Sequence, residues 1–217
     1  MDFAAERASL IAKLNSEIKD KRVLTAMSRV PRELFVPPES RYLAYEDGPL
    51  PIGHGQTISQ PFIVALMTEA LELTGSEKVL EVGTGSGYQS AILAELARLV
   101  ITTERIPDLA ESAQRVLSTL GYQNVIFQVT GDELGWPQES PYDAIIVTAG
   151  APAVPPDLVA QLTIGGRLVI PVGSKYVQEL CKFTRQSQRN RLENLGGCRF
   201  VPLIGKGAWT IEYHKEE

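Results

Sequence analysis

Three glycines follow an apolar run at alternate positions, as Gly83, Gly85 and Gly87. Because glycine has no Cβ atom, it lets a backbone bend sharply and approach a ligand closely. The apolar segment 78–82 is predicted as a buried parallel strand, and a helix is predicted to begin near Ser86. The free N–H groups and positive dipole end of that helix would face a bound anion. A strand-to-helix turn without a ligand is the alternative, but such turns usually need one glycine rather than three.

The spacing of these glycines separates two classes of cofactor. A dinucleotide fingerprint, G-x-G-x-x-G, would require glycine at position 88, where the chain has Tyr88. The spacing found is G-x-G-x-G, with Thr84 inside it and Glu81 shortly before it. This pattern resembles the first motif of the S-adenosylmethionine-dependent methyltransferases with a Rossmann-like fold, so methyl transfer is favoured over hydride transfer.

Acidic residues stand at the ends of the next two predicted strands, where open parallel sheets bind their ligands. Glu104 closes the strand 99–103, and a carboxylate there can accept hydrogen bonds from both hydroxyls of a ribose. Gly131 and Asp132 follow the strand 125–130, where the aspartate can accept from an adenine amine. S-adenosylmethionine offers adenosine to both acids and a charged methionine part to the glycine turn. The alternative for Glu104 is an exposed charge before a helix, and the alternative for Asp132 is an ordinary turn aspartate.

The elements around these residues alternate between helix and strand from position 61 onward. Such alternation predicts right-handed crossovers and a parallel sheet with helices on both faces. The predicted fold is α/β, a Rossmann-like doubly wound, mostly parallel sheet with an antiparallel hairpin at its edge. The predicted strands are 78–82, 99–103, 125–130, 144–147 and 167–172, with the hairpin strands 179–185 and 198–203 around the polar stretch 186–194; the predicted helices are 61–73, 86–98, 108–120 and a short one near 156–162.

The first sixty residues have a different pattern. Two amphipathic helices are predicted within roughly the first thirty residues, and the segment 42–55, rich in Gly and Pro, is predicted to be irregular. A long irregular segment in a compact domain is usually functional. We expect one methyltransferase domain, 1–217, in which 1–60 supplies N-terminal helices and a substrate loop. Residues 61–217 would then form the cofactor-binding core and the C-terminal hairpin.

Composition excludes several classes of protein. A chain of 217 residues with 44% hydrophobic residues can bury one sizeable core. The net charge of −5, without a basic stripe, argues against a nucleic-acid partner. With no apolar run of about 18 residues and no leader pattern, we expect no membrane partner and a cytoplasmic protein. Cys181 and Cys198 are expected to be buried thiols rather than a disulfide, and without zinc spacing no metal is expected.

The run GHGQTISQP at 53–61 precedes the helix that leads to the first predicted sheet strand, so it should lie over the cofactor pocket. Its Ser59 stands two residues before Pro61, which is typical of a helix N-cap followed by proline in the first turn. His54 is a candidate general base. Because it lies between two glycines, we interpret it as a loop residue.

Further runs in the chain accompany GHGQTISQP. They are VPRELFVP at 30–37, Tyr45, EVGTGSGY at 81–88, YDAIIVTA at 142–149 and VPLIGK at 201–206. Together they closely resemble the protein-L-isoaspartate O-methyltransferases over nearly the whole chain. The resemblance implies methylation of the free α-carboxylate of L-isoaspartyl residues in damaged proteins and peptides. S-adenosyl-L-methionine would be the cofactor and S-adenosyl-L-homocysteine the product, and the methyl ester would later close to a succinimide, which is a protein repair reaction.

The resemblance also implies roles for single residues. Ser59 falls on the catalytic-site residue of the family, and Thr57 and Ile58 fall on neighbours that line the cofactor and the substrate channel. The residues that we assign to the cofactor are Thr57, Ile58, Glu81, Gly83, Thr84, Gly85, Gly87, Glu104, Gly131 and Asp132. Isoaspartyl-containing proteins would be the partners. The oligomeric state stays open, with a monomer as the simplest expectation, and so does the order of the last two strands.

The chain departs from the family pattern at three positions. Glu133 stands where the family commonly has glycine, and Gly150 stands where alanine is usual, so we expect a slightly reshaped adenine pocket. Val64 occupies a position where some members carry histidine, so no histidine can act there.

The chemistry of carboxyl methylation limits what the protein must supply. A carboxylate with a pKa near 4 is already ionised at neutral pH and needs no general base. Ser59 is therefore expected to donate a hydrogen bond to one substrate oxygen while the other oxygen attacks the methyl group. Two other functions stay open, which are a methyltransferase for a small molecule such as a tetrapyrrole precursor and a nucleotide-binding module without catalysis.

Overall fold

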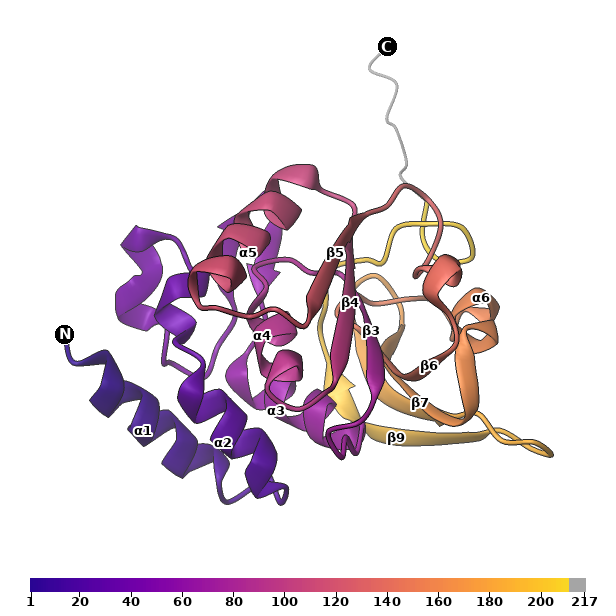
Figure 1. Cartoon of the computed structure of the whole chain (residues 1–217), viewed down its shortest axis with the longest axis horizontal. Coiled ribbons are helices and arrows are strands. Elements are labelled where there is room, and N and C mark those ends of the chain that lie inside the picture. The colour runs from indigo at the N-terminus through magenta and orange to yellow at the C-terminus, as the bar shows by residue number, and fades with distance from the viewer. Residues whose placement is uncertain (211–217) are drawn as a thin grey trace, which may run out of the picture.

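A seven-stranded sheet forms the centre of the computed structural model, which describes residues 1–210 (Figure 1). The strand order is β5-β4-β3-β6-β7-β8-β9, in which β3 to β7 pair in parallel and β8 pairs antiparallel with both β7 and β9. The strands are β3 (Lys78–Val82), β4 (Leu99–Glu104), β5 (Val125–Val129), β6 (Tyr142–Val147), β7 (Leu162–Gly173), β8 (Gln178–Thr184) and β9 (Arg191–Cys198). The predicted doubly wound α/β fold is confirmed, and the last two strands follow chain order to the edge.

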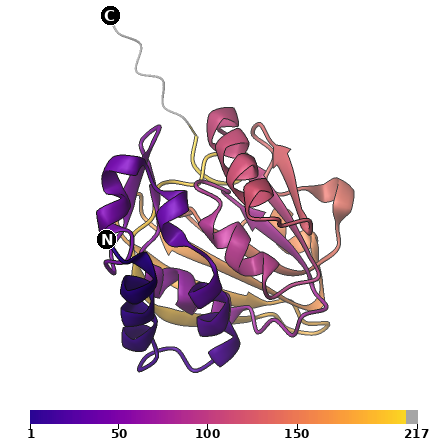
Figure 2. The ribbon, with the colours of Figure 1, turned by 60° about the vertical axis from the view of Figure 1, so that its left-hand side comes forward.

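Helices cover both faces of this sheet, with α1 to α5 on one side and α6 on the other (Figure 1). Figure 2 shows α1 and α2 side by side on the outside of the helical layer. The helices are α1 (Phe3–Leu14), α2 (Lys21–Arg29), α3 (Pro61–Ala70), α4 (Tyr88–Ala94), α5 (Pro107–Thr119) and α6 (Pro156–Ala160), with short 3₁₀ helices η1 (Arg32–Phe35), η2 (Pro38–Leu43) and η3 (Pro137–Glu139). One hydrophobic cluster joins residues of α1 and α2 to residues of α3, α4 and α5, so the N-terminal helices share a core with the α/β unit.

Alternation along β3 decides which side chains face which layer. Leu80 and Val82 pack into the cluster on the α6 side, whereas Val79 packs into the cluster on the α3 and α4 side. Since successive side chains of a strand point to opposite faces, Glu81 belongs with Val79. The carboxyl group of Glu81 is therefore directed toward α4.

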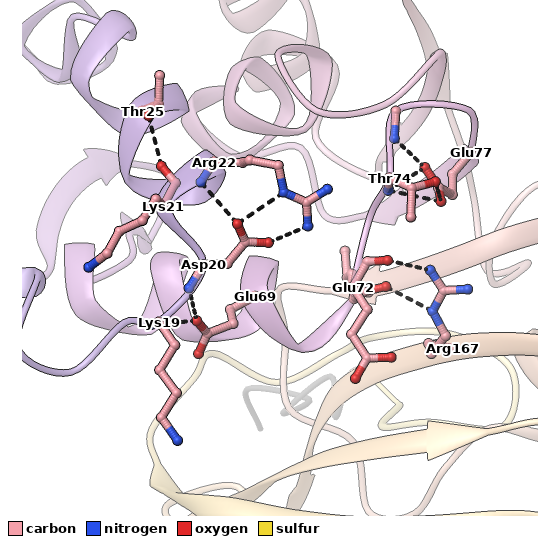
Figure 3. Close-up of polar contacts among 12 residues, drawn as sticks. Lys19, Asp20, Lys21, Arg22, Thr25, Glu69, Glu72, Thr74, Glu77 and Arg167 are labelled. Carbon is pink, nitrogen blue, oxygen red and sulfur yellow. Dashed lines mark hydrogen bonds and ion pairs between the residues drawn. The ribbon is translucent and has the colours of Figure 1, made fainter.

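Polar contacts fasten the N-terminal helices to α3, as Figure 3 shows. Asp20 caps α2 by accepting a hydrogen bond from the backbone N of Arg22 at 2.9 Å. The carboxylate of Glu69 on α3 accepts from the backbone N of Lys19 at 2.7 Å and of Asp20 at 2.6 Å. From the sheet, Arg167 of β7 donates to the carbonyls of Leu71 and Glu72, and these hydrogen bonds hold the C-terminal end of α3 against the sheet.

Two sequence predictions about elements were wrong. The second hairpin strand is β9 at Arg191–Cys198 and not 198–203, because Thr184 pairs with Arg191 across a short connection. This edge strand is largely exposed, so it tolerates the polar residues that made 186–194 resemble a loop. The segment 42–55 is also less irregular than expected, because β1 (Leu50–Gly53) and β2 (Gln56–Ile58) form a separate antiparallel hairpin.

Both cysteines are free thiols, with Cys181 buried in β8 and Cys198 only half-buried at the end of β9. No helix within residues 1–210 has the length and apolar character needed to cross a bilayer. The same residues contain no cluster of three or more His, Cys, Asp or Glu arranged to hold a metal ion.

Candidate active site

A cavity of about 160 Å³ lies beyond the carboxyl ends of the central parallel strands. This is the edge at which open α/β sheets bind their ligands. Several of the residues singled out in the sequence line it, from four separate segments of the chain: Thr57, Ile58, Ser59, Gly83, Thr84, Gly85, Glu104 and Gly131. Three others, Glu81, Gly87 and Asp132, are not among its lining residues.

The three glycines of the turn have different surroundings, although each has a positive φ, of 98°, 52° and 86° in order. A Cβ at Gly83 would lie 2.3 Å from Oγ1 of Thr148, and one at Gly87 would lie within 2.9 Å of Leu117 and Ala113 on α5. A Cβ at Gly85 would meet only Cδ1 of Ile52, at 3.6 Å. Gly83 and Gly87 are therefore required by packing inside the protein, whereas Gly85 leaves open the space from which a ligand approaches.

Glu104 holds the turn and the start of the following loop together. Its Oε2 accepts from the backbone N of Gly85 at 2.9 Å, and its Oε1 accepts from the backbone N of Arg105 at 2.8 Å and of Ile106 at 2.9 Å. The residue is only 8% exposed, so the alternative of a surface charge before a helix is wrong. Three N–H donors orient a carboxylate at the rim of the cavity, where it can also accept from a ligand hydroxyl.

Glu81 lies beneath the turn rather than in the cavity. Its Oε2 accepts hydrogen bonds from the hydroxyls of Ser90 and Thr102, and Oγ1 of Thr102 lies 2.6 Å from Oγ1 of Thr84. Complete burial raises the pKa of Glu81 to about 8, against the opposing effect of these two hydrogen bonds. Its Oε1 is buried without a hydrogen-bond partner among the residues that the structure describes. Glu81 therefore reaches the cavity only through Thr84.

The end of β5 places a different acid at the cavity from the one that the pattern favoured. Thr130, Gly131 and Glu133 line the cavity, while Asp132 does not and its carbonyl accepts from the backbone N of Lys206 at 2.7 Å. Sequence reasoning noticed Glu133 only as a departure from the family pattern. It also missed the cavity-lining segment 201–204, which was expected to be part of an edge strand and offers no polar side chain as a signal.

Ser59 lies half-buried on the cavity wall between β2 and α3. The N-cap of α3 is Gln60, and no side chain of that residue bonds the helix. Instead Asp47 accepts from the backbone N of Phe62 at 2.8 Å and from Nε2 of Gln60 at 3.0 Å. The alternative in which Ser59 serves only as the cap of this helix is therefore wrong, because Asp47, from the segment before β1, takes that place.

His54 lies at the tip of the β1–β2 hairpin, with a positive φ of 51°. Its Nε2 lies 3.5 Å from Oδ2 of Asp108 in the first turn of α5, and both side chains are well exposed. The residue does not line the cavity, so the interpretation of His54 as a loop residue is confirmed.

The strand order, the glycine turn over a cavity and the acid that closes the adjacent strand define a class of protein, the Rossmann-like S-adenosylmethionine-dependent methyltransferases. Among solved structures, a protein-L-isoaspartate O-methyltransferase superimposes with a TM-score of 0.83 at 31% identity, over 93% of this chain and 67% of that one. A Plasmodium falciparum protein described as such an enzyme, in complex with S-adenosyl-L-homocysteine, has a TM-score of 0.76 at 27% identity over 90% and 96% of the two chains.

The sequence comparisons narrow the class to one family. The pattern of the family described as Protein-L-isoaspartate(D-aspartate) O-methyltransferase matches residues 5–208. The protein-L-isoaspartate O-methyltransferase of Syntrophus aciditrophicus (strain SB) is 59% identical over 196 residues, which is 89% of this chain and 90% of that protein. That of Geobacter metallireducens is 53% identical over 212 residues, or 97% and 98%. The chain belongs to the protein-L-isoaspartate(D-aspartate) O-methyltransferase family.

Proposed function

We propose that this enzyme transfers the methyl group of S-adenosyl-L-methionine to the free α-carboxylate of L-isoaspartyl residues in damaged proteins and peptides. The observation that carries the proposal is that Ser59 and Glu104 line one cavity with the glycine turn, in a chain of this family. Isoaspartyl-containing proteins are the substrates, and repair of aged proteins is the outcome. A cytoplasmic, monomeric enzyme without a nucleic-acid partner is part of the proposal, and the net charge of −5 supports the last point.

The residues around the cavity fit S-adenosyl-L-methionine. The open space at Gly85 suits close backbone approach to the methionine part, and the oriented carboxylate of Glu104 suits the two ribose hydroxyls. At the end of β5, Gly131 and Glu133 line the wall that would face the adenine. Asp132, which lies between these two residues in the chain, is not among the lining residues. When bound, the cofactor supplies an activated methyl group with a neutral thioether as leaving group.

Ser59 does its work through its hydroxyl group. Because the substrate carboxylate is already ionised at neutral pH, the reaction needs orientation and partial desolvation rather than a base. The Ser59 hydroxyl can donate to one carboxylate oxygen and leave the other free to attack. Since Ser59 does not cap α3, its hydroxyl is not engaged in holding the helix. His54 is not among the lining residues, in keeping with a reaction that uses no general base.

The test is methylation of an isoaspartyl peptide beside its aspartyl isomer, with methyl-labelled cofactor. We expect base-labile label in the isoaspartyl peptide and background label in the isomer. Equal labelling of the two would contradict the substrate assignment. Cofactor binding without transfer to either peptide would favour a small-molecule methyltransferase or a nucleotide-binding module.

A further inference from the structure

Arg32 is a fully buried arginine in η1 that reaches three separate loops. Its Nε donates to the carbonyl of Ala44 at 2.8 Å, and its Nη2 donates to the carbonyl of Ser59 at 2.7 Å and, at a longer 3.5 Å, to that of Gly48. These carbonyls belong to the end of η2, the junction of β2 with α3 and the turn before β1. One guanidinium group therefore fixes the backbone of Ser59 against the segment around it.

The same guanidinium lies on the cofactor turn. Its central carbon is 4.7 Å from the centre of the Tyr88 ring, and Tyr88 is the first residue of α4, directly after Gly87. A cation over an aromatic face is attracted by the electrons of the ring. Tyr88 also lines the cavity, as Ser59 does. Arg32 thus bridges the two sides of the cavity, although it is not itself among the lining residues.

Arg32 is not part of an ordinary buried ion pair. Burying a charge without a counter-ion is costly, yet among residues 1–210 no carboxylate forms an ion pair with it, and its Nη1 has no hydrogen-bond partner. The adjacent carboxylate, Glu33, instead binds Arg7 at 3.3 Å and the Tyr45 hydroxyl. The guanidinium group therefore spends its hydrogen bonds on backbone carbonyls of separate segments rather than on a carboxylate, as a planar group with several donors can.

We propose that Arg32 is a positioning residue for methyl transfer, which holds the Ser59 backbone at a set distance from the cofactor turn. This inference rests on the proposed function of Ser59. Reaction by in-line displacement requires reacting atoms about 3–3.5 Å apart, and a misplacement of about 1 Å can cost on the order of 100-fold in rate. A planar fork that joins Ala44 and Ser59 and stacks on Tyr88 restricts that distance.

Two substitutions test the proposal. Arg32→Lys keeps the charge but loses the fork that spans Ala44 and Ser59, and Arg32→Gln loses the charge as well. For both we expect kcat to fall by at least about tenfold, while the KM for an isoaspartyl peptide and the Kd for S-adenosyl-L-homocysteine change by less than about threefold. Arg7→Gln is the matched control, because it breaks the Glu33 and Tyr45 contacts of the same layer without touching Ser59. It should lower Tm and leave kcat unchanged.

A double variant separates positioning from a structural role. If Arg32 acts through Ser59, Arg32→Lys in a Ser59→Ala background should change kcat by less than about twofold, because residues that act as a unit are not additive. Additive losses would overturn the proposal. Folded Arg32 variants with the wild-type kcat would also overturn it. A rise in KM at constant kcat would do the same, because it would indicate direct contact with the substrate carboxylate. Failure of both variants to fold at low temperature with S-adenosyl-L-homocysteine present would reduce Arg32 to a structural role and overturn the proposal as well. Absence of isoaspartyl methylation by the wild-type protein would instead reject the proposed function.

Discussion

Strand β3 has a buried glutamate near each end, and their environments are opposite. Glu77, just before the strand, accepts hydrogen bonds from the backbone N and the hydroxyl of Thr74 and from the backbone N of Gly75, as Figure 3 shows in part. Burial by itself would raise the pKa of Glu77, but these hydrogen bonds outweigh it and hold the pKa below its ordinary value. Glu81, near the carboxyl end, has one oxygen without a partner, and burial raises its pKa to about 8.

This difference distinguishes a structural end of the sheet from a ligand-binding end. At the amino end, backbone N–H groups satisfy the carboxylates of Asp20, Glu69 and Glu77. At the carboxyl end, a cavity remains and polar groups around Glu81 and Ser59 keep unused hydrogen-bonding capacity. Buried polar groups are normally paired, so the carboxylate of Glu81 is less completely satisfied than that of Glu77.

The largest effect should follow from a new charge at the carboxyl end. In Ser59→Asp a second anion would face the substrate carboxylate in a partly desolvated cavity, and we expect kcat/KM to fall by about 1,000-fold. S-adenosyl-L-homocysteine should still bind in calorimetry. Ser76→Asp, the same change in the exposed turn at the other end of β3, is the control and should keep full activity. Near-wild-type activity of Ser59→Asp would reject the role of the hydroxyl.

The second effect is an opposite pH dependence of stability at the two ends. With a folded pKa of about 8 against an ordinary 4.5, Glu81 binds a proton in the folded state that the unfolded state releases. The contribution of Glu81 to the free energy of unfolding is therefore lost as pH rises from about 4.5 to 8. The loss amounts to a few kcal/mol, since its size is set by the difference between the two pKa values. Glu77, with a lowered pKa, contributes above its ordinary pKa and loses that contribution as pH falls.

Unfolding of two glutamine variants by urea across pH 4 to 9 measures this contrast. Glu81→Gln should flatten the decline in unfolding free energy toward pH 8. Glu77→Gln should lower the unfolding free energy above pH 5 and leave its decline toward pH 8 intact. An unchanged slope in Glu81→Gln would show that folding does not raise the pKa of Glu81.

A third comparison concerns glycines with positive φ at the two ends. Gly85→Val places side-chain atoms where the ligand approaches, and we expect about a 100-fold weaker Kd for S-adenosyl-L-homocysteine in a protein that still folds. Gly75→Val also strains a positive φ, of 110°, but in open space at the amino end, so it should cost stability without changing the Kd. Equal affinities of the two variants would remove the glycine turn from the ligand site.

The smallest of these effects is expected from Glu104→Ala. Loss of the charged acceptor for two ribose hydroxyls should weaken S-adenosyl-L-homocysteine by about 1–3 kcal/mol in calorimetry. Glu77→Ala also removes a carboxylate bonded to turn N–H groups, and it should lower Tm but leave the affinity unchanged. If Glu104→Ala binds as tightly as the wild type, its carboxylate only ties Gly85 to the start of α5.

The amino-acid sequence by itself determined the features that depend on local pattern. The period of apolar residues identified the helices and the buried strands, and three glycines after β3 marked the turn, because both signals lie within a few neighbouring residues. The position of Glu104 followed from the rule that parallel strands end at one edge. Exposed polar strands such as β9 give no such signal, which is why that strand was misplaced.

Only the tertiary structure decided what each of these residues faces. Gly87 packs on α5, Asp47 caps α3 in place of Ser59, and Glu133 rather than Asp132 lines the cavity. Arg32 lies 27 residues before Ser59 and yet holds its carbonyl. Contacts of this kind depend on how distant segments pack, and a side chain with several possible partners takes the one that the packing brings within hydrogen-bond distance.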